Sequence, residues 1–148
     1  MFRRLALAAT LVLAGLVALP LAAVAAEPVK IAFHVDENDP ARLNLVLNNL
    51  QNVAKHYAAE GREVRIEVVA YGPGLDMLVA GKSPVAERIS AMAMELQGVA
   101  FAACADTMDA VERKTGTRPE LLPEAVVVPS GVVRLVELQE DGWAHVRP

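Results

Sequence analysis

Cysteine is nearly absent from this sequence, which has one, Cys104, among 148 residues. A single cysteine cannot form a disulfide within the chain, so disulfide cross-links are excluded as the basis of the fold. The chain also lacks Cys-x-x-Cys pairs and any spacing of His, Cys and carboxylate residues that is typical of metal ligands. We therefore predict no metal site, and no motif indicates a cofactor.

Positively charged residues are also few. Lys and Arg number 14 against 18 Asp and Glu residues, which gives a formal net charge of −4. Beyond residue 26, Lys and Arg stand side by side only at Arg113-Lys114. Nucleic-acid binding requires a basic surface that neutralises phosphates, so we predict no nucleic-acid partner.

Long apolar runs are confined to the N-terminus. Two arginines precede an apolar stretch, 5–21, that contains one polar residue, Thr10. Small residues follow, and the pattern predicts a secretory signal peptide over residues 1–26, cut after Ala25 or Ala26. An uncleaved N-terminal anchor is the alternative. We expect a protein that is periplasmic or otherwise exported, with no membrane segment after the cut.

The remaining residues, 27–148, have the length of one domain. Apolar runs typical of strands alternate with stretches of helical period. We expect strands at 29–35, 63–71, 99–104, 125–128 and 143–147, and helical segments at 41–60, 75–80, 85–96, 106–116 and 132–140. Such alternation is typical of an α/β domain with a parallel sheet and helices on both faces.

Cys104 follows the apolar run 99–103, which predicts a strand that is covered on both faces. Asp106 is the expected N-cap of the next helix. The thiol would then lie beside a helix N-terminus, which favours anions, although the Asp106 carboxylate opposes a thiolate. Two interpretations stay open: a small core residue, and a reactive free thiol.

Other polar residues follow the remaining strands. His34 and Asp36 end the first strand, the turn 72–74 follows the second, and 129–131 follows the fourth. Because parallel strands place their carboxyl ends along one edge, we expect these residues to share a site with Cys104. His34 is a candidate base or thiolate partner, or a packed residue.

The segment Gly72-Pro73-Gly74 begins like a dinucleotide fingerprint but has Met77 in place of the third glycine. It also follows the second strand. We interpret it as a tight turn that lets the backbone approach a ligand or another subunit. The methionines, Met94 among them, are interpreted as core filling.

Two further groups of polar residues stand out. The helix expected at 41–60 is rich in amides, including Asn49. We expect these amides to form a solvated face, contacts between subunits or a polar lining to the site. His56 and His145 have no supporting spacing, and we interpret them as surface or packing residues.

Segments along the whole domain resemble the DsrE/DsrF-like family. The similarity is closest to small, often exported members with an F-x-A-C-x-N-T-like segment, a V-P-S-G-V segment and a G-W/Y-A-Y-I-R/K-P-like tail. The matching segments are 101–108 and 127–148, and the stretches 30–40, 48–52 and 69–78 fit the same pattern. At the position of Asp106 we expect Asn in close relatives.

The resemblance implies a three-layer α/β/α sandwich with a mostly parallel five-stranded sheet. It also implies homo-oligomers, commonly trimers or hexamers. Better-understood members carry sulfur as a persulfide at the position of Cys104 and pass it between proteins, so a sulfur donor or acceptor protein is an expected partner. The residues thus expected at the site are Cys104, His34, Asp36, Asn49, Gly72, Gly74, Asp106, Thr107, Ser130 and Gly131.

The leading hypothesis is a periplasmic sulfur carrier with sulfurtransferase-like relay chemistry at Cys104. Backbone N–H groups near Asp106 and Thr107 would hold the anion, and His34 would be the proton partner. The alternative is a non-catalytic oligomeric module that binds a small anion or a protein and has a buried structural cysteine. A third hypothesis is a redox sensor that forms an intersubunit disulfide.

Overall fold

A computed structural model describes residues 26–148, and the predicted signal peptide up to residue 25 lies outside them. The strands are β1 (Val29–Val35), β2 (Val64–Ala70), β3 (Val99–Cys104), β4 (Ala125–Val128) and β5 (Ala144–Val146). The helices are α1 (Pro40–Ala59), the 3₁₀ helix η1 (Gly72–Leu78), α2 (Ala86–Glu95), α3 (Ala105–Thr115) and α4 (Gly131–Glu140). No described helix is both long enough and apolar enough to span a bilayer.

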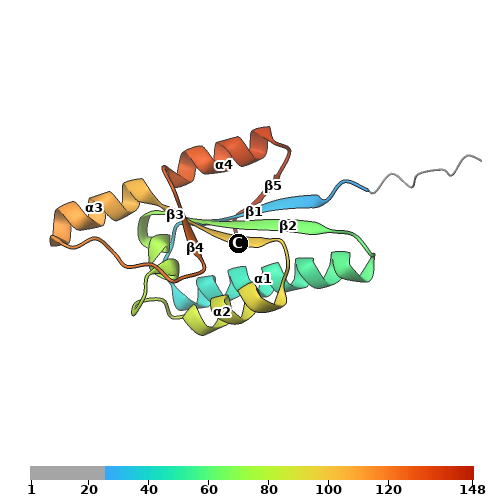
Figure 1. The fold of residues 1–148 in the computed structure, drawn as a ribbon, viewed down its shortest axis with the longest axis horizontal. Coiled ribbons are helices and arrows are strands. Elements are labelled where there is room, and N and C mark those ends of the chain that lie inside the picture. The colour runs from blue at the N-terminus through green and yellow to red at the C-terminus, as the bar shows by residue number, and fades with distance from the viewer. Residues whose placement is uncertain (1–25) are drawn as a thin grey trace, which may run out of the picture.

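The five strands form one parallel sheet in the order β4-β3-β2-β1-β5 (Figure 1). This confirms the predicted α/β class. The last strand of the chain pairs with the first, and β1 therefore lies between β2 and β5. All five carboxyl ends lie along one edge of the sheet, which we call the carboxyl edge.

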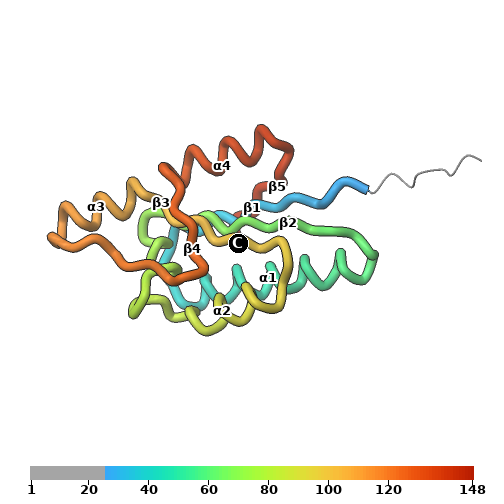
Figure 2. The backbone as a smooth tube through the Cα atoms, viewed as in Figure 1, coloured from blue at the N-terminus to red at the C-terminus, as the bar shows by residue number. Residues whose placement is uncertain are grey.

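Helices α1 and α2 cover one face of the sheet and α4 covers the other (Figure 1). The larger core lies under α1, where Leu43, Leu47 and Leu50 are fully buried. The smaller one lies under α4 and includes Leu135 and Leu138. Helix α3 runs on past the carboxyl edge (Figure 2), and only its Met108 is buried.

Helix α1 begins where its sequence predicts. The Asp39 carboxylate accepts a hydrogen bond from the Ala41 N–H at 3.1 Å, and Pro40 occupies the first turn, where a missing N–H costs nothing. The helix ends before Gly61, whose φ of 67° suits glycine. Because α1 begins just after the end of β1, its start lies at the carboxyl edge, and these local signals fix where it begins.

Two local expectations were wrong. The N-cap of α3 is Cys104 and not Asp106, because β3 passes into the helix with no connecting residue. Met94 is 81% exposed, so it fills no part of the core.

Strand β3 is not covered on both faces along its whole length. Ala100 is exposed although residues 101–104 are buried. Helix α4 packs over Ala32, Val69 and Ala102 but leaves the sheet beside Ala100 open. The uncovered surface lies on the α4 side of the sheet, toward its β4 edge.

Candidate functional site

Tyr71 and Cys104 lie side by side at the carboxyl edge, and His34 lies on the same face of the sheet, two residues further back in the register. Val69 pairs in register with both His34 and Ala102, and the residues just before Tyr71 and Cys104 pair with each other. Val69 and Ala102 face α4. Side chains two positions apart in a strand share a face, so Tyr71 and Cys104 also point toward α4.

A chain of hydrogen bonds joins three side chains of this edge. Tyr71 Oη lies 2.6 Å from His34 Nε2, and His34 Nδ1 lies 3.2 Å from His145 Nε2. The rings stack, with centroids 5.0 Å apart for Tyr71 and His34 and 5.3 Å apart for the two histidines. The chain runs from β2 through β1 to the exposed His145 on β5.

A carboxylate and an arginine flank this chain. Asp36 Oδ2 lies 3.7 Å from His34 Nε2, and Arg147 donates to both oxygens of Asp36 at 3.1 and 2.9 Å. Arg147 also donates to Glu37 at 3.4 Å. Asp36 thus makes its short, bidentate contact with Arg147 and only a longer one with His34.

The surroundings favour the neutral forms of His34 and Tyr71. Burial lowers the pKa of His34 below its usual 6.5; Asp36 opposes this, while His145 and Arg147 add to it. Burial also raises the pKa of Tyr71 above 10.0; the charge of Asp36 adds to this increase, while Arg147 opposes it. At neutral pH the pair is therefore an imidazole and a phenol, and the phenol can donate a hydrogen bond to His34 Nε2.

Cys104 is buried, with 3% of its surface exposed. It stands at the start of α3, where the Asp106 N–H donates to Pro129 O at 3.2 Å. The Gly72 N–H donates to Thr107 Oγ1 at 2.9 Å. These two bonds join the ends of β2, β3 and β4, and they occupy the Asp106 N–H that we had expected to hold an anion.

Glycine is needed at the first residue of α4. A Cβ on Gly131 would lie 2.8 Å from Tyr71 Cβ and 2.9 Å from Tyr71 Cδ1. Gly131 thus lets the helix approach the Tyr71 ring and hold it against the sheet. Its neighbour Ser130 is the N-cap residue of α4 but makes no side-chain capping bond.

Most of the residues predicted for the site are at the carboxyl edge, and Asn49 is not. It lies nine residues beyond Pro40 in α1, roughly 14 Å along the helix from the edge. Gly74 is buried against the backbone of Val35, so the close approach expected of this turn is to its own chain.

Tyr71, His145 and Arg147 were not among the residues predicted for the site, and His145 was expected to be a surface or packing residue. Tyr71 was placed at the end of a strand, and the other two stand in the last five residues, on or next to β5. Only the pairing of β5 with β1 brings them to His34 and Asp36. The signal that could have found them is the His-x-Arg spacing of the tail, which matches the His-x-Asp spacing of β1.

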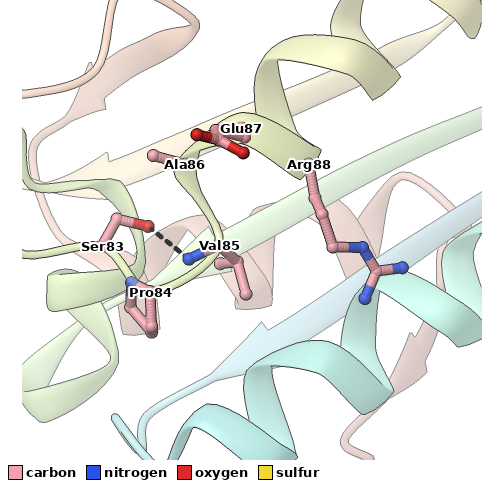
Figure 3. A pocket seen from close by; sticks show the side chains of 6 residues that line it. All are labelled: Ser83, Pro84, Val85, Ala86, Glu87 and Arg88. Carbon is pink, nitrogen blue, oxygen red and sulfur yellow. Dashed lines mark hydrogen bonds between the residues drawn. The ribbon is translucent and has the colours of Figure 1, made fainter.

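The amide-rich face of α1 has a different partner. Arg88 of α2 donates to Asn44 Oδ1 at 2.6 Å, Asn48 Oδ1 at 2.9 Å and Gln51 Oε1 at 3.3 Å. Figure 3 shows its guanidinium pointing toward α1, away from the loop that begins at Ser83. These amides thus connect α1 and α2 through hydrogen bonds, on the face of the sheet opposite the site. The surface pocket of about 390 Å³ beside Arg88 is not part of the site.

Comparison with known proteins identifies the family. The model of the DsrE/DsrF-like family matches residues 29–148. The chain belongs to this family. A solved structure of a protein of unknown function from Methanobacterium thermoautotrophicum, MTH1491, is 37% identical, covers 81% of this chain and 99% of its own, and superposes with a TM-score of 0.68. No curated protein matches the chain.

Proposed function

We propose that this DsrE-like protein is an exported sulfur carrier that holds sulfane sulfur as a persulfide on Cys104. The observation that carries the proposal is the position of the thiol. Cys104 ends β3 and is the N-cap of α3, beside Tyr71 and on the face of the sheet that also carries His34. The positive end of the α3 dipole favours the anionic sulfur that a carrier must stabilise.

The transfer step needs no external oxidant. The Cys104 thiolate attacks the outer sulfur of thiosulfate, a new S–S bond forms, and the S–S bond of thiosulfate breaks as sulfite leaves with its electron pair. Cys104 then carries a persulfide anion. A donor protein persulfide reacts in the same way and leaves as a thiolate.

Intact mass of the protein purified from the exported fraction tests this proposal. After incubation with thiosulfate, we expect wild type to gain the mass of one sulfur atom and Cys104→Ala to gain none. The same spectrum reads the N-terminus, which we expect at Ala26 or Glu27. An unprocessed N-terminus would contradict export with cleavage.

The burial of Cys104 favours one alternative, an anion- or protein-binding module with a structural cysteine. Thiol labelling with and without denaturant separates the two functions. A carrier must react in the native state, because its donor has to reach Sγ. A thiol that labels only after denaturation supports the binding module.

The homo-oligomer implied by the family forms part of the proposal. The open part of the sheet next to α4 is lined by apolar residues together with the paired Glu67 and Arg134. Helix α4 itself exposes Val132, Val133 and Val136. Val126 of β4 is 63% exposed beside them. An apolar surface of this kind is typical of contact with another protein, and we propose a second copy of this chain.

We expect Val133→Glu to lower the molar mass in solution from a trimer or hexamer to one chain. A buried charge at an apolar contact is costly unless it is paired. Light scattering on a sizing column gives the mass. Met94→Glu is the matched control, because Met94 lies on α2, on the opposite face. A wild-type monomer, or equal masses for Val133→Glu and wild type, would contradict this interface.

A further inference from the structure

We propose that the turn Asp141-Gly142 is a site of isoaspartate formation, and that contacts from Lys30 and Trp143 protect it from this modification in the folded protein. Asp141 is the only Asp or Asn in the sequence that is followed by glycine. Glycine has no side chain to hinder attack by its own nitrogen, so this dipeptide is the most reactive of its kind. The turn joins α4 to β5, the strand that carries His145.

The modification exchanges one water molecule and needs no oxidant or cofactor. The Gly142 nitrogen loses its proton and attacks Cγ of the protonated Asp141 carboxyl group; a C–N bond forms, and a C–O bond breaks as water leaves. Water then opens the five-membered imide. When water attacks the main-chain carbonyl of Asp141, the C–N bond to that carbonyl breaks and the chain continues through Cγ and Cβ. The product is isoaspartate, with unchanged mass.

The backbone of the turn has the wrong shape for closing this ring. With ψ of 13° at Asp141, the Gly142 nitrogen nearly eclipses the Asp141 nitrogen and is turned away from Cβ. Ring closure must bring it beside Cβ instead. The Gly142 N–H donates to Gln139 O at 3.0 Å, and this bond holds the unreactive shape. The Asp141 N–H donates to Glu137 O at 3.0 Å and adds to it. The turn must therefore open locally before it reacts.

Side-chain contacts hold the same turn to the sheet. Lys30 Nζ donates to Asp141 Oδ2 at 3.0 Å and to the Asp141 carbonyl oxygen at 3.2 Å. Trp143 Nε1 donates to Oδ2 at 3.1 Å. The bond from Lys30, followed by the one from Trp143, lowers the pKa of Asp141 below its usual 3.8. The carboxylate therefore stays charged, and the charged form resists attack by the nitrogen.

The modification would act on the candidate site through β5. An isoaspartate adds one carbon to the main chain between α4 and β5, and it displaces the carboxylate that Lys30 binds. Strand β5 has three residues and pairs with β1 from Ile31 to Phe33. This short pairing brings His145 Nε2 to 3.2 Å from His34 Nδ1. We expect isoaspartate to loosen β5 and to separate the two histidines.

Peptide mapping with electron-transfer fragmentation, after storage of the purified protein at neutral pH, measures isoaspartate at residue 141. We expect slow formation in folded wild type and fast formation in wild type unfolded in urea. Lys30→Met should raise the rate in the folded protein by about 3- to 10-fold, the factor by which loss of one or two exposed hydrogen bonds changes an opening equilibrium. Equal rates in folded and unfolded wild type would overturn the proposal, as would equal rates for folded Lys30→Met and wild type.

Two controls separate a local effect from general unfolding. Lys82→Met removes another exposed lysine, which pairs with Asp76 at 3.8 Å, and its rate at residue 141 should equal that of wild type. Asp109 precedes Ala110 in α3 and is read in the same map. A rise confined to residue 141 in Lys30→Met supports the proposal, whereas an equal rise at Asp109 would mean that the variant unfolds and would contradict it.

Hydrogen exchange tests the consequence for β5. The isoaspartate form of wild type, separated by ion exchange, should lose protection of the backbone amides at 144–146 relative to the unmodified form. The protection of β2 should be the same in both forms, because β2 does not contact the turn through any of these bonds. Unchanged protection at 144–146 would contradict the effect on β5.

Discussion

Replacing Gly74 by alanine should lower the free energy of unfolding by about 3 kcal/mol, the upper part of the range for overpacking a core. Gly74 is buried in η1. An added Cβ would overlap Val35 O and lie 2.6 Å from Val35 C and 2.8 Å from Asp36 N. All three atoms are backbone, so no side-chain rotation relieves the contact, and the end of β1 must shift.

Gly72→Ala is the matched control for this substitution. Gly72 lies in the same turn, with φ of 53° and no atom within 4 Å of an added Cβ. Its cost is conformational only, about 1 kcal/mol. Urea unfolding at one fixed protein concentration measures both. Equal losses for the two variants would mean that Gly74 does not pack against β1 as described. Because β1 carries His34, we also expect Gly74→Ala to disturb the hydrogen bond between His34 and Tyr71.

Arg134→Met should destabilise the protein by about 3 kcal/mol, because it leaves a buried carboxylate without its partner. Glu67 is 7% exposed in the middle of the sheet. Arg134 donates to its two oxygens, from Nε and Nη2, at 2.7 Å each. This bidentate bond raises the pKa of Arg134, so the guanidinium stays charged wherever the protein is folded.

The double variant identifies the cause of that loss. Glu67→Met combined with Arg134→Met removes both charges, and we expect it to recover most of the stability. Arg118→Met is the control: Arg118 pairs with Asp109 and Glu112, but its side chain is 44% exposed. Its loss should be much smaller than that of Arg134→Met, because an exposed ion pair contributes little to stability. A double variant as unstable as Arg134→Met would show that packing, not the unpaired charge, sets the cost.

The elements whose signals are local could be predicted from the sequence. Helix α1 combines an apolar face with Asp39 and Pro40 at its start and Gly61 at its end, and all three signals act within one or two turns. The strands were predicted from short apolar runs between turn residues. Their parallel arrangement follows from the alternation with helices, and the family match agrees with it.

The parts that depend on distant pairing could not be predicted. His34 and His145 are 111 residues apart, and only the place of β5 beside β1 joins them. The exposure of Ala100 depends on where α4 ends across the sheet, which no local pattern encodes. The cap of α3 was misassigned because Asp106 has the chemistry of an N-cap, while the pairing of Cys104 with Val128 fixes the end of β3.

The central claim, that Cys104 carries sulfur, is tested most directly by one cycle of loading and release followed by intact mass. Thiosulfate should add one sulfur atom to wild type. Cyanide should then remove it, as the persulfide sulfur leaves as thiocyanate and the Cys104 thiolate is restored. The account predicts one thiocyanate per chain from wild type and none from Cys104→Ala. Absence of the added sulfur in wild type, or an equal yield of thiocyanate from Cys104→Ala, would contradict it.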